Sequence, residues 1–172
     1  MTLAVIFAGF GLLSVTVGCS SAQRSGERRP TDFTLDALVV NPESALGETP
    51  RWRRQARYVL EADGELRVAV GPGVGDRTIP RRTRKLGPGE RDEVWTLTRD
   101  AGLLEAESPR VVPWGQTWRA PPGEVSAVFS VTGGGRRVHS AAPMGASSGL
   151  GAPRVEALLD RLGELAWIPE RD

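Results

Sequence analysis

The sequence predicts an α+β domain of two layers, an antiparallel sheet of about five strands with two helices packed on one face. Short stretches in which apolar and polar residues alternate indicate the strands, and two longer stretches with apolar residues at helical spacing indicate the helices. Glycine-containing turns join two pairs of strands, and tight turns require antiparallel pairing. The order after a first strand is hairpin, helix, hairpin, helix, which gives two ββα units at 57–104 and 124–168.

The first three strands are predicted at residues 32–40, 57–62 and 65–70, because apolar residues recur at every second position in each. Asp63-Gly64 separates the second strand from the third, and this dipeptide favours a type I′ turn whose twist matches paired strands. We expect a helix to cover the even-numbered face of this hairpin, which carries Tyr58, Leu60, Leu66 and Val68.

Residues 71–87 are rich in glycine, proline and arginine, and we interpret them as a loop. The first helix is predicted from about Gly89 to Ala101, because Pro88 suits the start of a helix and Gly102 suits a left-handed C-terminal cap. Its apolar stripe is formed by Val94, Leu97 and Ala101, with Trp95 beside it.

The second unit follows a proline-rich loop at 105–123. Alternating residues predict a strand at 125–131, the run Thr132-Gly133-Gly134-Gly135 predicts a turn, and 136–141 is its return strand. The last helix is predicted from Pro153 to about Ala166, where apolar residues recur at three- and four-residue spacing.

The first 21 residues form a separate feature. An uncharged apolar run, Leu3 to Val17, precedes Gly18-Cys19-Ser20-Ser21, and Cys19 is the single cysteine of the chain. The run is shorter than the roughly 20 residues of a membrane span and fits the apolar core of a signal peptide. The arrangement resembles the signal peptide and lipobox of a bacterial lipoprotein. It departs from that pattern at Thr16, where Leu, Val or Ile is usual, and in lacking Lys or Arg near Met1.

The resemblance implies that residues 1–18 are a signal peptide and that the Cys19 thiol is acylated and becomes the new N-terminus. Residues 19–31 would then be a flexible tether and 32–172 a single α+β domain. The protein would be held at the bacterial cell envelope, on the periplasmic face of the inner or outer membrane. Two alternatives stay open for this segment, an uncleaved N-terminal membrane anchor and an unmodified, buried cysteine.

Composition excludes several classes of function. A net charge of +1 argues against a dedicated nucleic-acid binder, because such domains are strongly basic. With Cys19 as the single cysteine and His139 as the single histidine, no internal disulfide, thiolate metal site or imidazole zinc site can form. We therefore expect no cofactor and no metal, and we expect a monomer.

Two glycine-rich segments resemble motifs that carry chemistry in other proteins. Gly145-Ala146-Ser147-Ser148-Gly149 matches the G-x-S-x-G nucleophile elbow of α/β-hydrolases. Those enzymes have an acid and a histidine after the serine and a parallel sheet, whereas His139 precedes Ser147 and hairpins require antiparallel strands. A serine hydrolase that uses Ser147 with His139 therefore stays the alternative, not the favoured interpretation. The glycines of 71–75 lack the spacing of a phosphate-binding fingerprint.

Tryptophans and arginines in the loops are the better candidates for an interaction surface. Exposed indole area usually finds a partner, and a basic patch attracts anionic groups. The candidate residues are Trp52, Arg53, Arg81, Arg82, Trp114 and Trp118. The sequence thus favours a non-catalytic envelope lipoprotein that binds another protein, a glycan or the membrane surface. The alternatives are the serine hydrolase and a structural component of an envelope assembly.

Overall fold

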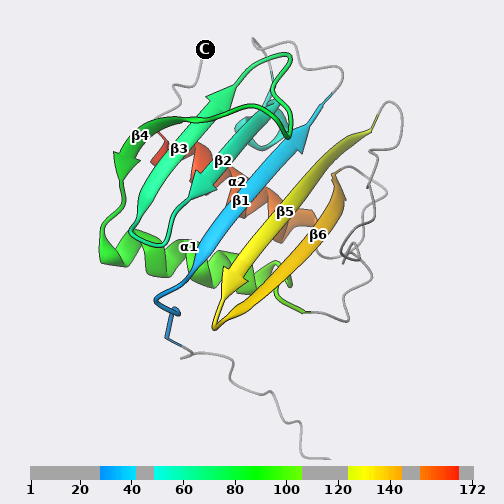
Figure 1. Cartoon of the computed structure of the whole chain (residues 1–172). Helices are drawn as coiled ribbons and strands as arrows, with labels where there is room; N and C mark the ends of the chain where they lie inside the picture. Colours follow the sequence, from blue (N-terminus) through cyan, green and yellow to red (C-terminus); the bar gives the residue numbers. More distant parts are fainter. Residues whose placement is uncertain (1–27, 42–48, 106–123, 145–151, 167–172) are drawn as a thin grey trace, which may run out of the picture.

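The computed structural model describes residues 28–41, 49–105, 124–144 and 152–166, and these form one six-stranded antiparallel sheet with both helices on one face (Figure 1). The predicted α+β class is confirmed, with six strands in place of about five. The strand order is β4-β3-β2-β1-β5-β6. The strands are β1 Thr34–Val40, β2 Ala56–Leu60, β3 Glu65–Val70, β4 Arg81–Lys85, β5 Val125–Gly133 and β6 Arg136–Met144; the helices are η1 Arg51–Arg53, a short 3-10 helix, α1 Pro88–Asp100 and α2 Ala152–Leu165.

Strand β1 lies in the middle of the sheet and joins its two halves. It pairs antiparallel with β2 on one side and β5 on the other, so that Ala37 lies opposite both Tyr58 and Phe129. The hairpin β2–β3 and the hairpin β5–β6 therefore flank the first strand. Each of the two predicted ββα units supplies one hairpin to this sheet and one helix to its covered face. The first unit also supplies β4.

The core lies between the sheet and the two helices. Burial alternates along β1, where Leu35, Ala37 and Val39 are buried and the residues between them are partly exposed. The even-numbered face of the β2–β3 hairpin is the covered one, as predicted. Trp95 of α1 packs edge-on against Phe33, with 5.0 Å between ring centroids. The largest fully buried side chains are Tyr58, Phe33, Phe129, Leu35, Leu60, Leu66, Leu103, Leu158, Leu159 and Leu162.

The prediction of a loop over 71–87 is wrong at β4. This strand has the sequence Arg-Arg-Thr-Arg-Lys, so it shows no alternation of apolar and polar residues. It lies at the edge of the sheet and pairs with β3 alone, and a bulge between Leu66 and Arg67 shifts the register. Cationic side chains are typical of edge strands because they discourage pairing with a further strand.

The two hairpins turn differently. In β2–β3 the Gly64 N–H donates to the Glu61 carbonyl at 2.9 Å, and Gly64 has a φ of 93°. The Glu61 N–H also donates to the Glu65 carbonyl at 2.9 Å, so three residues, 62–64, connect this hydrogen-bonded pair in place of the predicted two-residue type I′ turn. In β5–β6 both Gly134 and Gly135 have positive φ, 60° and 72°, which is what a type I′ turn requires.

Helix α1 begins and ends within one residue of its prediction. The Gly87 N–H donates to Glu90 Oε2 at 2.8 Å, which satisfies a backbone donor ahead of the first turn. Gly102 follows the helix with a φ of 69°, and the Leu103 N–H donates to the Thr98 carbonyl at 3.3 Å. Leu103 is buried, as the predicted cap requires. No helix in the described ranges is long and apolar enough to cross a membrane.

Candidate functional site

Residues 71–80, which we call the strap, cross the face of the sheet that the helices leave open (Figure 1). Arg57, on the open face of β2, donates through Nη1 to the carbonyl of Thr78 at 2.9 Å and also to the carbonyl of Asp76. Gln55 Nε2 donates to the Val74 carbonyl at 2.6 Å. The strap is therefore fixed to the sheet by side chains of β2 and of the residue just before it.

Arg57 is itself held by an acidic residue of β1. Its Nε donates to Asp36 Oδ1 at 3.0 Å and its Nη2 donates to Asp36 Oδ2 at 2.7 Å, which is a bidentate ion pair. The hydrogen-bonded carboxylate of Asp36 raises the pKa of Arg57. Within the strap, the Gly75 N–H donates to Thr78 Oγ1 at 2.9 Å. The strap thus has a frame of charged and neutral hydrogen bonds.

Exposed apolar and cationic side chains lie on the strap and beside it. Ile79 is 86% exposed and Val70 is 37% exposed, and these are the exposed large hydrophobic residues among those the structure describes. Val70 directly precedes the strap, and Ile79 is its last residue but one. Arg77 and Arg81 are exposed and make no ion pair or side-chain hydrogen bond with any described residue. We call Arg77, Ile79 and Arg81 the strap surface.

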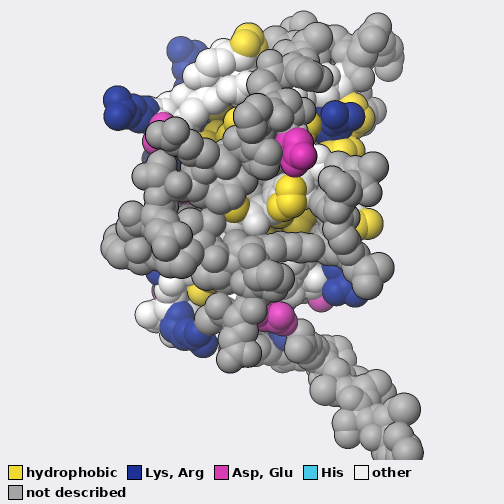
Figure 2. Space-filling view, turned by 90° about the vertical axis from the view of Figure 1, so that its right-hand side faces the viewer, with side chains coloured by type: hydrophobic (Ala, Val, Ile, Leu, Met, Phe, Trp, Pro, Cys, Tyr) yellow, Lys and Arg dark blue, Asp and Glu magenta, His cyan; other side chains and the backbone are white. Residues whose placement is uncertain are grey.

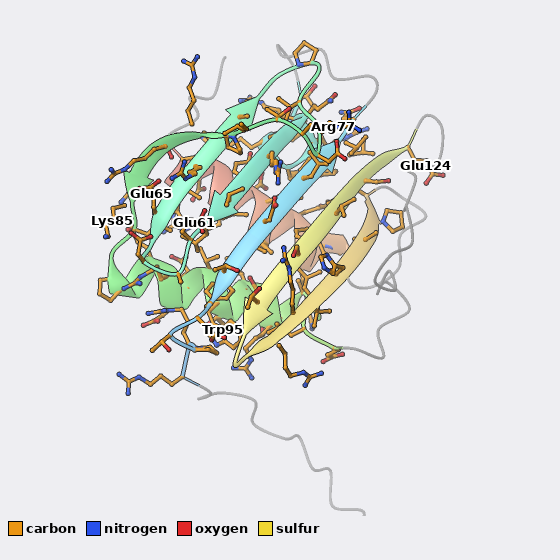
Figure 3. All side chains as sticks on the ribbon, in the orientation of Figure 1. Glu61, Glu65, Arg77, Lys85, Trp95 and Glu124 are labelled. Carbon is orange, nitrogen blue, oxygen red and sulfur yellow. The ribbon has the colours of Figure 1, made fainter. Side chains whose placement is uncertain are left out.

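The predicted basic patch is largely neutralised along β4. Arg82 Nε lies 3.3 Å from Glu65, which also pairs with Arg67 at 2.5 Å. Arg84 pairs with Glu90 at 2.6 Å, and Lys85 pairs with Asp63 at 3.2 Å; Figure 3 shows Glu65 and Lys85 at this edge of the sheet, away from Arg77. Of the four cations of β4, Arg81 is the one left for a partner outside the described residues.

Trp52 and Arg53 belong to a different place, the short helix η1 that packs on α2. The Trp52 N–H donates to Asp160 Oδ1 at 3.1 Å, and its side chain is half-buried against the core. The Arg53 guanidinium lies 5.5 Å from the centre of the Trp52 ring. Arg54 is buried and donates to the Thr49 carbonyl at 2.9 Å. These contacts hold η1 on the domain and give Trp52, Arg53 and Arg54 a structural role.

His139 lies on the open face of β6, directly opposite Ser130 of β5. Its burial and the nearby Arg137 cation lower its pKa below the ordinary 6.5, so the imidazole is neutral near pH 7. Ser130 Oγ accepts a hydrogen bond from Arg137 Nε at 2.9 Å. Ser147 lies outside the described residues, as do Cys19, Trp114 and Trp118. The pairing of His139 with Ser147 therefore stays a prediction.

No protein-family model matches the chain, and no curated protein is significantly similar to it. Within the described part of the chain, no three His, Cys, Asp or Glu residues are grouped to hold a metal ion. The strap was not predicted, although the sequence contains one signal of it. Ile79 is a lone large aliphatic residue between Arg77 and Arg81, which is unusual for a residue with no apolar stretch to join.

Proposed function

We propose that this chain is a lipid-anchored protein of the bacterial cell envelope whose folded domain is a non-catalytic binding module. The apolar run Leu3–Val17 followed by Cys19 supports the anchor, because it resembles a lipobox. The strap surface supports binding, and the observation that carries the proposal is its exposed isoleucine between two arginines that no described residue pairs.

The physical properties of the strap surface favour a partner with both apolar and anionic groups. Transfer of an isoleucine side chain from water into an interface contributes about 1.5–3 kcal/mol. Exposed cations beside it steer an anionic partner and disfavour a cationic one. Because Arg57 and Gln55 already hold the strap in place, binding costs little conformational entropy there. An envelope partner with an apolar site bordered by carboxylates or phosphates fits these properties.

Site-specific photo-cross-linking in cells that express the full chain tests this function. A photoreactive amino acid replaces Ile79 in one variant and Thr96, which is exposed on α1, in the matched control. We expect one discrete adduct at position 79, none of the same mass at position 96, and loss of the adduct when Arg77→Gln and Arg81→Gln are added. The same adducts from both positions, or none from position 79, would contradict the proposal.

A further inference from the structure

The chain enters the domain at the end of the sheet where β5 turns into β6. Asp32 Oδ1 and Oδ2 accept hydrogen bonds from the backbone N–H groups of Gly134 and Gly135, at 2.8 and 2.6 Å. Just before it, Arg29 Nε lies 2.8 Å from Asp92 Oδ1 of α1. The strap lies at the opposite end of the sheet (Figure 1). The predicted tether therefore joins the domain at the end away from the strap surface.

This entry end is rich in arginine, and we call Arg28, Arg29, Arg136 and Arg137 the turn end. The neighbouring acids Asp32 and Asp92 are both engaged by the contacts just described, so the four arginines exceed these two carboxylates by two positive charges. The β2–β3 turn lies at the same end of the sheet and adds no net charge, because Glu61 and Asp63 are matched there by Lys85, which pairs with Asp63, and by Arg91, which donates to the Ala62 carbonyl. Arg28 and Arg136 are exposed and have no side-chain partner among the described residues. Lys and Arg side chains reach the surface at the lower end of the molecule in Figure 2 as well as at its upper end.

We infer that the turn end docks on the anionic lipid headgroups of the membrane that holds the protein, with the strands end-on and the strap surface directed away. The inference rests on the proposed function, because the lipid on Cys19 is what keeps the domain near the bilayer. Eight residues, 20–27, separate Cys19 from Arg28, and a fully extended chain of that length spans at most about 30 Å. The turn end is thus confined to the neighbourhood of the headgroups.

Charge and geometry then favour contact. The guanidinium group offers N–H donors in a planar fork that matches phosphate oxygens. An arginine brought within the screening length of about 8 Å interacts with an anionic surface, and each such residue shifts the docking equilibrium by about fivefold. Arg136 and Arg137 follow the turn on neighbouring positions of β6, so they project toward opposite faces of the sheet. Because Arg137 donates to Ser130 Oγ, the headgroup contacts fall to Arg136 and Arg28.

Fluorescence quenching on vesicles tests the docking. The full, lipidated chain is labelled at Thr31→Cys, an exposed position at the turn end, or at Pro72→Cys on the strap. Acylation makes the natural Cys19 unreactive toward the label. The vesicles contain phosphatidylcholine with a nitroxide headgroup quencher, with or without phosphatidylglycerol. We expect phosphatidylglycerol to increase quenching at position 31 and not at position 72, and we expect salt to reverse the increase.

Two matched pairs of variants show which arginines are responsible for the increase in quenching. Arg28→Gln with Arg136→Gln is expected to weaken docking by about 25-fold, whereas Arg77→Gln with Arg81→Gln removes the same charge at the strap and is expected to leave quenching unchanged. Equal effects of the two pairs, or quenching at position 31 that ignores lipid charge, overturn the docking. Flotation of the chain with phosphatidylcholine vesicles tests separately whether the lipid on Cys19 attaches the protein to a membrane. A chain that floats without charge-dependent quenching refutes the docking alone, and one that does not float refutes the proposed function and the docking together.

Discussion

Arg57 is the residue on which the organisation of the open face depends. It connects an acid of β1 with two carbonyl groups of the strap, so a single guanidinium links three segments that are distant in the sequence. Its side chain is 20% exposed, and hydrogen bonds to a charged group in such a place are stronger than those at a fully exposed surface.

Replacement Arg57→Gln is therefore expected to release the strap and to lower the free energy of unfolding by about 1–3 kcal/mol. Urea unfolding measures the stability, and the rate of trypsin cleavage after Arg77 and Arg81 measures the release. Arg77→Gln is the control, because an exposed arginine without a partner contributes within about 0.5 kcal/mol. If both variants unfold at the same urea concentration, Arg57 does not hold the strap.

Asp32 makes the stability of the fold depend on pH. The two N–H groups of Gly134 and Gly135 stabilise its charged form, so they lower its pKa below the ordinary value of 3.8. A carboxyl whose pKa is lower in the folded state stabilises the fold above pH 3.8, and this stabilisation is lost as the pH falls through the lowered pKa. Asp32→Asn is expected to be less stable than the wild type at pH 7, and the difference is expected to shrink toward pH 3. Urea unfolding at both pH values checks this, and a difference that grows at pH 3 would refute the linkage.

At the scale of elements, the helices and hairpins could be predicted because each buries one face. Tyr58, Leu60 and Leu66 alternate with polar residues, and this pattern is set by the core they enter. Strand β4 could not be predicted, because an edge strand with side chains such as Arg82 and Lys85 has no buried face to leave a pattern. Its place is fixed by backbone pairing with β3, which a local sequence pattern does not encode.

The same reasoning applies to the site. The strap depends on Arg57, which lies 21 residues before Thr78 and 21 after Asp36, and no local spacing indicates these contacts. The predicted cluster of Trp52 and Arg53 was visible because its residues are adjacent in the sequence. Adjacency does not show which cations pair with acids of other elements, and the structure separates Trp52 and Arg53 on η1 from Arg81 and Arg82 on β4.

Gly163 in α2 gives a prediction at this scale. A glycine inside a helix costs about 1 kcal/mol relative to alanine, but a Cβ at this position would lie 3.2 Å from Arg51 Cδ and 3.5 Å from Tyr58 Oη. Gly89 in α1 has open space around it. Thermal unfolding is expected to show that Gly89→Ala stabilises the domain and that Gly163→Ala does not, because η1 must shift to accept the added methyl group. Equal stabilisation by the two changes would show that η1 is not closely packed on α2.

At the scale of the whole molecule, the two ends of the sheet have different surroundings. The chain enters beside the β5–β6 turn, and the strap lies at the other end, with β1 running between them. If the protein is anchored through Cys19, this arrangement holds one end near the membrane and leaves the strap surface accessible. Strand β1 is paired on both sides, so the sheet has no hinge between the end where the chain enters and the end where the strap lies.

Loss of the lipid anchor is expected to change where the protein is found without changing the stability of its domain. Cys19→Ser should leave the thermal unfolding of the domain unchanged, because the described residues form their core without this segment. The same change should move the protein out of the membrane fraction or leave an unprocessed precursor. Fractionation and a mass measurement of each pool distinguish these results. A Cys19→Ser chain that is processed and fractionates like the wild type would mean that another segment holds the protein.

The intact mass of the mature protein extracted from membranes shows directly whether Cys19 carries lipid. We expect a chain that begins at Cys19 and is heavier than its sequence by two or three acyl chains. A full-length polypeptide that begins at Met1 with an unmodified Cys19 thiol would contradict it.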